Sequence, residues 1–172
     1  MPERAGSLVI GYFAGCFLTA AIVARVAKGR NIREIGTGNP GMANVMANIG
    51  KKAGVIVLLG DILKTVLGMG VAWALFGSSL GRNAFLWSGL GCVLGHNFPF
   101  WCKGKGGKGV TVTCSWLIVL MPIWGSFACI LGGLLTLQTG YLPLGAVVIP
   151  ATAIPFAIWK LGREGFLLIA LG

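Results

Sequence analysis

Residues 53–76 read AGVIVLLGDILKTVLGMGVAWALF, and this stretch decides the fold class. It is twenty-four residues long and carries only two charged side chains, Asp61 and Lys64. A helix needs about 20 apolar residues to cross the hydrocarbon core of a bilayer, which is about 30 Å thick. The stretch therefore predicts a transmembrane helix.

The composition of the whole chain supports the same class. Of 172 residues, 56% are hydrophobic and only 10% are charged, with a mean hydropathy of +0.86. A soluble domain usually carries about 25% charged residues. We expect an all-α, polytopic bundle of transmembrane helices that forms a single membrane domain over residues 1–172. Small residues let such helices approach closely, and Gly11-x-x-x-Gly15 and Gly91-x-x-x-Gly95 fit that use.

Four further apolar segments flank the first one, and together they predict five to seven spans. Pro122 is expected to kink the third of these four segments, and Pro150 and Pro155 to break the last one. Lys160 and Arg163 close the last segment, and the apolar run after it, Gly165–Gly172, is too short to span. The four segments are Leu8–Ala24, Ala84–Trp101, Val110–Leu137 and Tyr141–Trp159.

The basic residues predict the orientation in the membrane. The chain carries 14 Lys and Arg against 4 acidic residues, for a net charge of +10. Eleven of the basic residues fall in the loops after the first and third segments and at the end of the fifth, and two, Arg4 and Arg82, fall on the other side. Basic residues gather in short cytoplasmic loops. We expect the N-terminus outside, the basic loops in the cytoplasm, membrane lipids as partners and no nucleic acid.

Two glycine-rich, basic loops lie on the predicted cytoplasmic side. The loop within Gly95–Thr113, GHNFPFWCKGKGGKGVTVT, holds Lys103, Lys105 and Lys108, and the linker Lys28–Lys52 holds a second glycine cluster. Glycines let backbone amides approach an anion, and lysine supplies charge to phosphate oxygens. An ordinary basic loop beside anionic lipid explains the composition equally well. Two such loops on one side favour a phosphate site.

Other kinds of site fit the sequence poorly. Both loops match G-x-G-x-x-G, but membrane-length apolar sequence flanks them in place of the strands of a dinucleotide fold. The five cysteines are scattered and form no C-x-x-C pair, and the chain has one histidine and few carboxylates. We therefore expect no metal and no cofactor.

Three ionisable residues lie near or inside the apolar segments. Asp61 and Lys64 are three positions apart and share one helix face, and Asp61 lies about 12 Å into the segment at 1.5 Å per residue. Charges at that depth are costly and normally have a partner, so the two form a structural ion pair or shape a polar pocket beneath the loops. His96 is either a hydrogen-bonding residue or a proton-transfer group.

Two long motifs resemble a known family. GTGNPGMANV (residues 36–45), followed by GKKAG (50–54) and DILK (61–64), and GHNFP (95–99), with KGGKGV (105–110), are similar to motifs of the bacterial acyl-phosphate:glycerol-3-phosphate acyltransferases, the PlsY family. The resemblance implies an inner-membrane enzyme that moves a fatty acyl group from acyl phosphate to the sn-1 hydroxyl of glycerol 3-phosphate, giving lysophosphatidic acid and phosphate. Its substrates would be the chain's partners, and it needs no cofactor.

The resemblance also implies roles for residues at the matching positions. His96, Asn39 and Thr37 would be catalytic, with His96 orienting or deprotonating the attacking hydroxyl. Lys105 and Lys108, with the amides of Gly106 and Gly107, would bind phosphate. The remaining substrate-binding residues would be Asn44, Asp61, Lys64 and Thr113.

The chain departs from the family pattern at several positions. Thr37 replaces a serine, Ala47 an arginine and Gly104 a phenylalanine, and the third family motif is absent from the 172 residues. A fragment or a reduced paralogue would show these departures. Two alternatives therefore stand beside the enzyme: a degenerate member that binds lipid phosphates or a partner without turnover, and a small anion transporter lined by Asp61 and Lys64.

Overall fold

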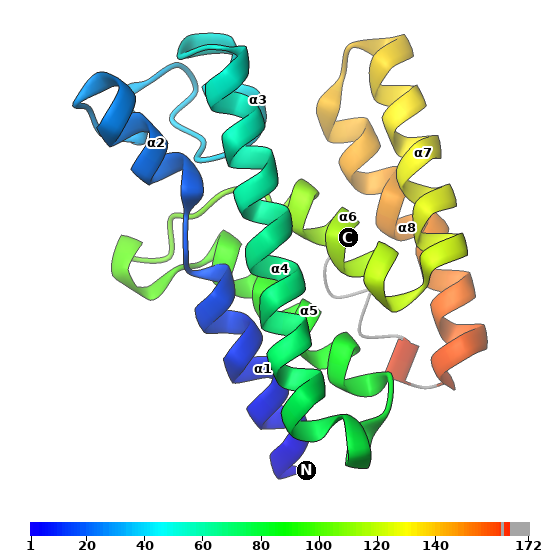
Figure 1. Cartoon of the computed structure of the whole chain (residues 1–172). Coiled ribbons are helices and arrows are strands. Elements are labelled where there is room, and N and C mark those ends of the chain that lie inside the picture. The colour runs from blue at the N-terminus through cyan, green and yellow to red at the C-terminus, as the bar shows by residue number, and fades with distance from the viewer. Residues whose placement is uncertain (163, 166–172) are drawn as a thin grey trace.

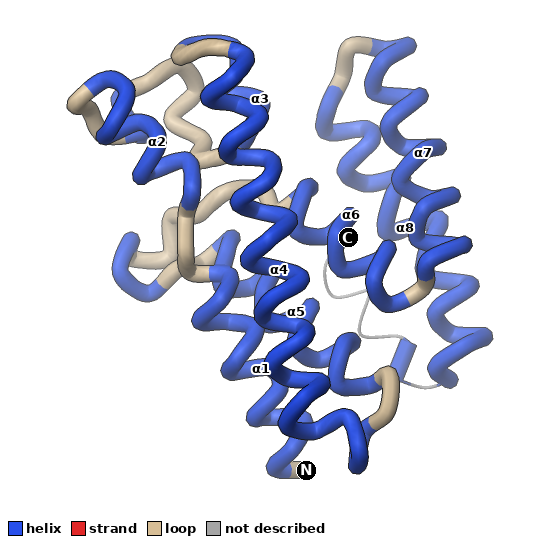
Figure 2. Tube along the Cα trace, in the orientation of Figure 1, coloured by secondary structure: helices blue, strands red, loops and turns tan. Residues whose placement is uncertain are grey.

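The computed structural model describes residues 1–162 and 164–165, and in that part of the chain it contains helices and no strand (Figure 2). The all-α prediction is confirmed. Arg163 and the apolar run from residue 166 onward lie outside the described residues. The helices are α1 (Pro2–Gly15), α2 (Thr19–Lys28), η1 (Ile32–Glu34), α3 (Met42–Asn48), α4 (Lys51–Leu80), α5 (Asn83–Asn97), η2 (Phe100–Cys102), α6 (Val110–Leu120), α7 (Pro122–Thr139) and α8 (Leu142–Leu161).

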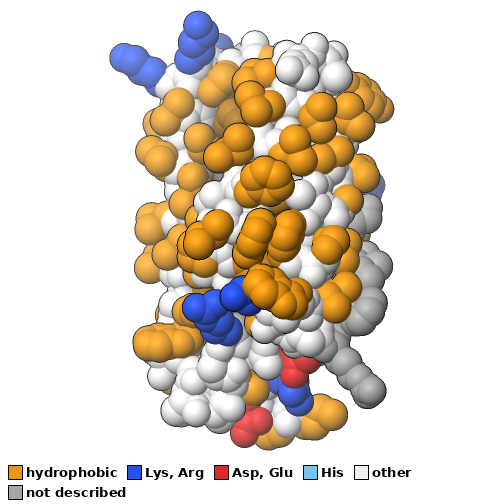
Figure 3. Space-filling model, turned by 90° about the vertical axis from the view of Figure 1, so that its right-hand side faces the viewer, with side chains coloured by type: hydrophobic (Ala, Val, Ile, Leu, Met, Phe, Trp, Pro, Cys, Tyr) orange, Lys and Arg blue, Asp and Glu red, His pale blue; other side chains and the backbone are white. Residues whose placement is uncertain are grey.

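Four helical stretches in the described residues are long and apolar enough to cross a membrane: Pro2–Lys28, α4, α7 and α8. The sequence led us to expect five to seven. The difference arises because α5 and α6 have only 15 and 11 residues. One face of the molecule shows the apolar surface that a bilayer requires, with hydrophobic side chains over its middle and basic ones at the top and toward the bottom (Figure 3).

The first apolar segment is not one uninterrupted helix, which corrects the expectation for Leu8–Ala24. α1 ends at Gly15, Leu18 is extended (φ −98°, ψ 95°), and α2 starts at Thr19. The break leaves carbonyl groups without helical partners. Lys64 of α4 takes two of them, since its Nζ donates to Gly15 O (3.3 Å) and Phe17 O (2.7 Å). No proline marks this break in the sequence, and Thr19, the first residue of α2, is the polar residue next to it.

Prolines act differently in the fourth and fifth segments. Before Pro122 the chain breaks fully, because Met121 takes φ −139° and ψ 79° and α7 begins at the proline. A proline disfavours the helical conformation of the residue that precedes it. Pro150 and Pro155, by contrast, lie inside α8, which continues through both. The predicted break in that segment was wrong, in keeping with the tolerance of membrane helices for proline.

The glycine pairs of α1 and α5 pack backbone against backbone, which confirms the predicted close approach. A Cβ added at Gly11 or Gly15 would overlap the carbonyl groups of Ser88 or Cys92, and one at Gly91 or Gly95 would overlap Leu8 or Tyr12. α4 packs against both helices, so α1, α4 and α5 lie side by side (Figure 1). Helix α6 joins this group to the α7–α8 pair.

Two hydrophobic clusters position the loops. The larger one centres on Trp116 of α6, whose indole lies against Gly89 and donates to Phe85 O (3.0 Å). The smaller one holds α2, η1 and α3 against Val57 of α4. Together they bring the two long non-helical stretches, residues 35–41 and 103–109, to the same side of the molecule (Figure 2).

Candidate active site

A single buried side chain, Asn44 of α3, holds the first glycine-rich loop. Its Nδ2 donates to Ile35 O (2.9 Å) and Asn39 O (3.0 Å), and its Oδ1 accepts from Thr37 N (3.0 Å). Asn48 donates to the same Oδ1 from one turn later (3.0 Å). With its polar atoms engaged inside the protein, Asn44 shapes the loop, and its predicted contact with substrate stays a prediction.

Backbone hydrogen bonds hold the second loop. Gly106 N donates to Asn97 O (2.8 Å) and Gly107 N to His96 O (2.9 Å), so the loop folds back on the end of α5. A Cβ at Gly106 would overlap the His96 carbonyl oxygen, and one at Gly107 would overlap the His96 ring. These glycines are therefore required for close approach. Both amides donate to carbonyl groups here, and their predicted use as phosphate donors stays a prediction.

A buried polar cluster lies beneath the two loops. Asp61, Lys64 and His96 are 2%, 6% and 3% exposed. Lys64 Nζ lies 2.9 Å from Asp61 Oδ1 and 2.8 Å from His96 Nδ1. The structure contains the ion pair between Asp61 and Lys64, which was one of the two interpretations of these charges, and their predicted substrate-binding role stays a prediction. The Lys64 ammonium also links the carbonyl groups at the break in the first segment to His96, the only histidine of the chain.

The geometry of the cluster sets the proton positions on His96. An ammonium group can only donate, so Nδ1 of His96 accepts from Lys64. In a neutral ring the proton then lies on Nε2, which makes Nε2 a donor on the side that faces Gly107. This arrangement suits the orienting role expected for His96. It leaves neither ring nitrogen free to take a proton.

A cavity of about 90 Å³ opens above this cluster, at the start of α6. Since a water molecule takes about 30 Å³ in the liquid, the cavity has room for a group of about the size of phosphate. No side chain caps the N-terminus of α6, where free amides favour anions. The lining residues that bear on its chemistry are Asn39, Asp61, His96, Lys108 and Thr111.

The structure separates the two lysines that were expected to bind one phosphate. Lys108 lines the 90 Å³ cavity, and with Thr113 it also lines a neighbouring cavity of about 140 Å³. Lys105 lines a different cavity, beside Arg33. Thr37 is exposed, and its Oγ1 accepts from Asn39 N (3.4 Å) outside the 90 Å³ cavity. The predicted set thus divides, with Asn39, Asp61, His96 and Lys108 together and Lys105, Thr37 and Thr113 apart.

Comparisons with known proteins show the family of this chain. The family model described as "Glycerol-3-phosphate acyltransferase" matches residues 5–172. The chain belongs to the glycerol-3-phosphate acyltransferase family. Relatives of that name in Lactobacillus johnsonii and Alkaliphilus metalliredigens are 37% and 32% identical over 96% and 93% of this chain and 75% and 80% of their own length.

Solved structures of the acyltransferase family share the fold. PlsY (YgiH), an integral membrane glycerol 3-phosphate acyltransferase, matches in its glycerol 3-phosphate form with a TM-score of 0.82 and 27% identity, over 98% of this chain and 84% of that chain. Its lysophosphatidic acid form matches with a TM-score of 0.77 and 25% identity, over 98% of this chain and 87% of that chain. The membrane-protein class expected from the sequence is confirmed.

The sequence did not predict a role at the site for two residues of this acyltransferase family member. Arg33 donates to Gly38 O (3.2 Å) and Gly106 O (3.4 Å), so it joins the two glycine-rich loops. Asn97 lines the cavity of Lys108 and Thr113, and its buried Oδ1 has no hydrogen-bond partner among the described residues. Asn97 adjoins His96 within the second motif, and this position could have indicated that Asn97 belongs to the site. Arg33 looks like any other basic residue of its loop.

Proposed function

We propose that this chain transfers a fatty acyl group from acyl phosphate to the sn-1 hydroxyl of glycerol 3-phosphate, forming lysophosphatidic acid and phosphate for phospholipid synthesis. The observation that carries the proposal is the small cavity where Asn39, His96 and Lys108 meet at the start of α6. The related PlsY structures in glycerol 3-phosphate and lysophosphatidic acid forms support it.

The cavity suits an anionic substrate group. Lys108 supplies a positive charge, and the first amides of α6 supply partial positive charge and donors. His96 Nε2 and the Asn39 amide are further polar groups in or beside the same space. Asp61 adds no free negative charge there, because Lys64 lies 2.9 Å from its carboxylate. The cavity as a whole is therefore cationic.

The reaction needs little beyond positioning and charge stabilisation. The hydroxyl oxygen bonds to the acyl carbonyl carbon, the bond from that carbon to the phosphate oxygen breaks, and phosphate departs with the electron pair. The hydroxyl proton goes to the departing phosphate, since the lone pair of His96 accepts from Lys64 and the Asp61 carboxylate lies 2.9 Å from the Lys64 ammonium, although Asp61 Oδ1 accepts no hydrogen bond among the described residues. The phosphate expelled from an acyl phosphate dianion carries three negative charges at the moment of bond breaking, so it takes up the hydroxyl proton and departs as hydrogen phosphate.

The proposed setting is the bacterial inner membrane, with the N-terminus outside and both glycine-rich loops at the cytoplasmic face. The distribution of basic residues supports this orientation. In that setting glycerol 3-phosphate reaches the loops from the cytoplasm, and the acyl chain of acyl phosphate lies among membrane lipids. Both substrates meet at the loop side of the helices.

Phosphate release from palmitoyl phosphate tests the function directly. Purified protein should release phosphate only when glycerol 3-phosphate is present, with an equal amount of lysophosphatidic acid formed. Lys108→Ala should lower this rate by about a hundredfold, in the range for losing one preorganised donor. Lys52→Ala, an exposed lysine that lines none of the cavities described above, is the matched control.

Two results would reject the proposal. If folded protein binds glycerol 3-phosphate but releases no phosphate, the chain is a degenerate family member that binds without turnover. Lys108→Ala turning over as fast as Lys52→Ala would place the chemistry elsewhere.

A further inference from the structure

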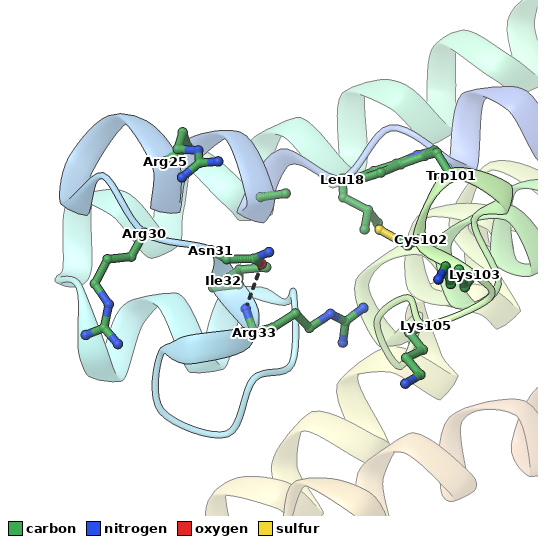
Figure 4. Close-up of a pocket in the computed structure, with 11 residues that line it drawn as sticks. Leu18, Arg25, Arg30, Asn31, Ile32, Arg33, Trp101, Cys102, Lys103 and Lys105 are labelled. Carbon is green, nitrogen blue, oxygen red and sulfur yellow. Dashed lines mark hydrogen bonds between the residues drawn. The ribbon is translucent and has the colours of Figure 1, made fainter.

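A second, larger cavity lies on the other side of the lysine loop, outside the proposed catalytic cavity. Its volume is about 630 Å³, and it is bounded by α2 and η1 on one side and by η2 and the loop after it on the other (Figure 4). None of its lining residues is acidic, and Glu34, which follows the lining residue Arg33 in the chain, is paired with Arg30 (3.5 Å). The cavity is thus strongly cationic. Its five basic lining residues are Arg25, Arg30, Arg33, Lys103 and Lys105.

The basic side chains differ in how far they are engaged. Arg30 lies at the outer edge in Figure 4 and donates to Glu34 O (3.1 Å). Arg33 extends from η1 toward the loop that carries Lys103 and Lys105 (Figure 4). Within the described residues, the structure records no hydrogen bond or ion pair for the side chains of Lys103 and Lys105. Several positive charges therefore face one space without a counter-charge.

An apolar groove continues from the cationic cavity. It has a volume of about 310 Å³ and shares Leu18, Ala21 and Trp101 with the cavity. The indole of Trp101 is fixed as a wall, since its Nε1 donates to Cys16 O (2.8 Å). The remaining groove residues are aromatic, aliphatic or cysteine: Phe13, Cys16, Phe17, Ile22 and Phe100.

A cationic cavity that opens into an apolar groove matches one kind of molecule, an amphiphile with a phosphate head and an acyl tail. We propose that this cavity and groove bind a membrane phospholipid with a phosphomonoester headgroup, of the phosphatidate class, separately from the catalytic cavity. The lysines and arginines contact the phosphate, and the groove covers the first part of an acyl chain. Free phosphate would leave the groove unused.

The site is linked to the catalytic cavity through Arg33. Its guanidinium lines the cationic cavity while it donates to Gly38 and Gly106 in the two glycine-rich loops. A phosphate bound there lies beside Arg33, whose side chain hydrogen-bonds to both loops. The bound lipid therefore contacts the scaffold of the active site without entering it.

Lipid binding to the full-length protein in uncharged detergent tests the proposal. The probe is phosphatidate with brominated acyl chains, read as quenching of tryptophan fluorescence. The double variant Arg25→Gln/Lys103→Gln should bind it at least about tenfold more weakly, because each basic residue near an anionic lipid surface contributes about a fivefold factor in affinity. Lys28→Gln/Lys51→Gln removes the same charge from exposed positions outside the cavity and should bind within twofold of the unchanged protein.

Competition separates the possible ligands. Brominated phosphatidate should be displaced by unlabelled phosphatidate and resist equal concentrations of inorganic phosphate or phosphatidylcholine. If both double variants bound brominated phosphatidate equally weakly, the cavity would act only as part of a general basic surface, and the proposal would be overturned. If inorganic phosphate displaced the probe as effectively as unlabelled phosphatidate does, the site would recognise phosphate alone, and the proposal of a lipid occupant would be overturned. Acyl transfer is not measured, so failure here leaves the proposed function untouched.

Discussion

The two glycine-rich loops line the same small cavity but are held in opposite ways. A side chain, Asn44, fills the first loop and bonds to Ile35, Thr37 and Asn39 from inside it. The second loop is held by its own amides on the carbonyl groups at the end of α5. The first therefore depends on the chemistry of one residue. The second depends on the absence of side chains, so the two should fail under different substitutions.

The largest effect is expected from adding a methyl group to the second loop. In Gly106→Ala the new Cβ would overlap the His96 carbonyl oxygen, so the backbone beside His96 and Lys108 must move. Displacements of about 1 Å at an active site can cost a hundredfold in rate. We expect acyl transfer to fall by about a hundredfold, measured as phosphate release.

Gly104→Ala is the control for that change. It lies in the same loop with φ +70°, where alanine is strained, but open space surrounds its added Cβ. The loss should stay below about tenfold. If both alanines cost the same, backbone strain rather than contact with α5 governs the second loop.

A smaller but still large loss is expected when the first loop loses its internal side chain. Asn44→Ala removes hydrogen bonds to three loop residues and leaves buried backbone groups unpaired, at about 1–3 kcal/mol each. Acyl transfer should fall by about thirtyfold, and amide hydrogen exchange of residues 35–39 should speed up.

Asn48→Ala is the matched control, since its side chain bonds only to Asn44 and leaves the loop contacts in place. Its rate should stay within about threefold of the unchanged protein. Slow exchange at residues 35–39 in Asn44→Ala would contradict the assignment of Asn44 as the support of the loop.

The smallest effect is expected from separating the two loops. Arg33→Gln removes donors to Gly38 O and Gly106 O that lie at 3.2 and 3.4 Å on an exposed side chain. Exposed interactions of this kind contribute little, so we expect a fall in acyl transfer of about fivefold. Arg30→Gln, three residues away and bonded to Glu34, should change the rate less. Equal rates in the two variants would show that each loop stands alone.

The sequence predicted those parts of the molecule that follow from local chemistry. Residues 53–76 are apolar over a membrane length, and they form α4. The glycine spacings of α1 and α5 lie where backbones meet, and Asp61 pairs with Lys64 one turn away. Each depends on helical periodicity alone.

The features that the sequence did not predict depend on distant contacts. The break at residues 16–18 lies in apolar sequence and is bound by a lysine that comes 47 to 49 residues later. Lys105 and Lys108 are close in sequence, but the glycine loop between them turns onto α5 and sends them to different cavities. Glycine-rich backbone has too many accessible conformations for spacing to fix where its side chains point.

The contact of Lys64 with the carbonyl groups of Gly15 and Phe17 also bears on how the chain is made. During synthesis the first helix enters the bilayer well before α4. An ammonium group inside the bilayer is costly until it meets its acceptors. The interrupted first helix supplies two acceptors for Lys64 in addition to Asp61 on α4 itself, so the buried charge favours packing of α4 beside the first helix within the membrane. Catalytic geometry and membrane assembly thus depend on the same lysine.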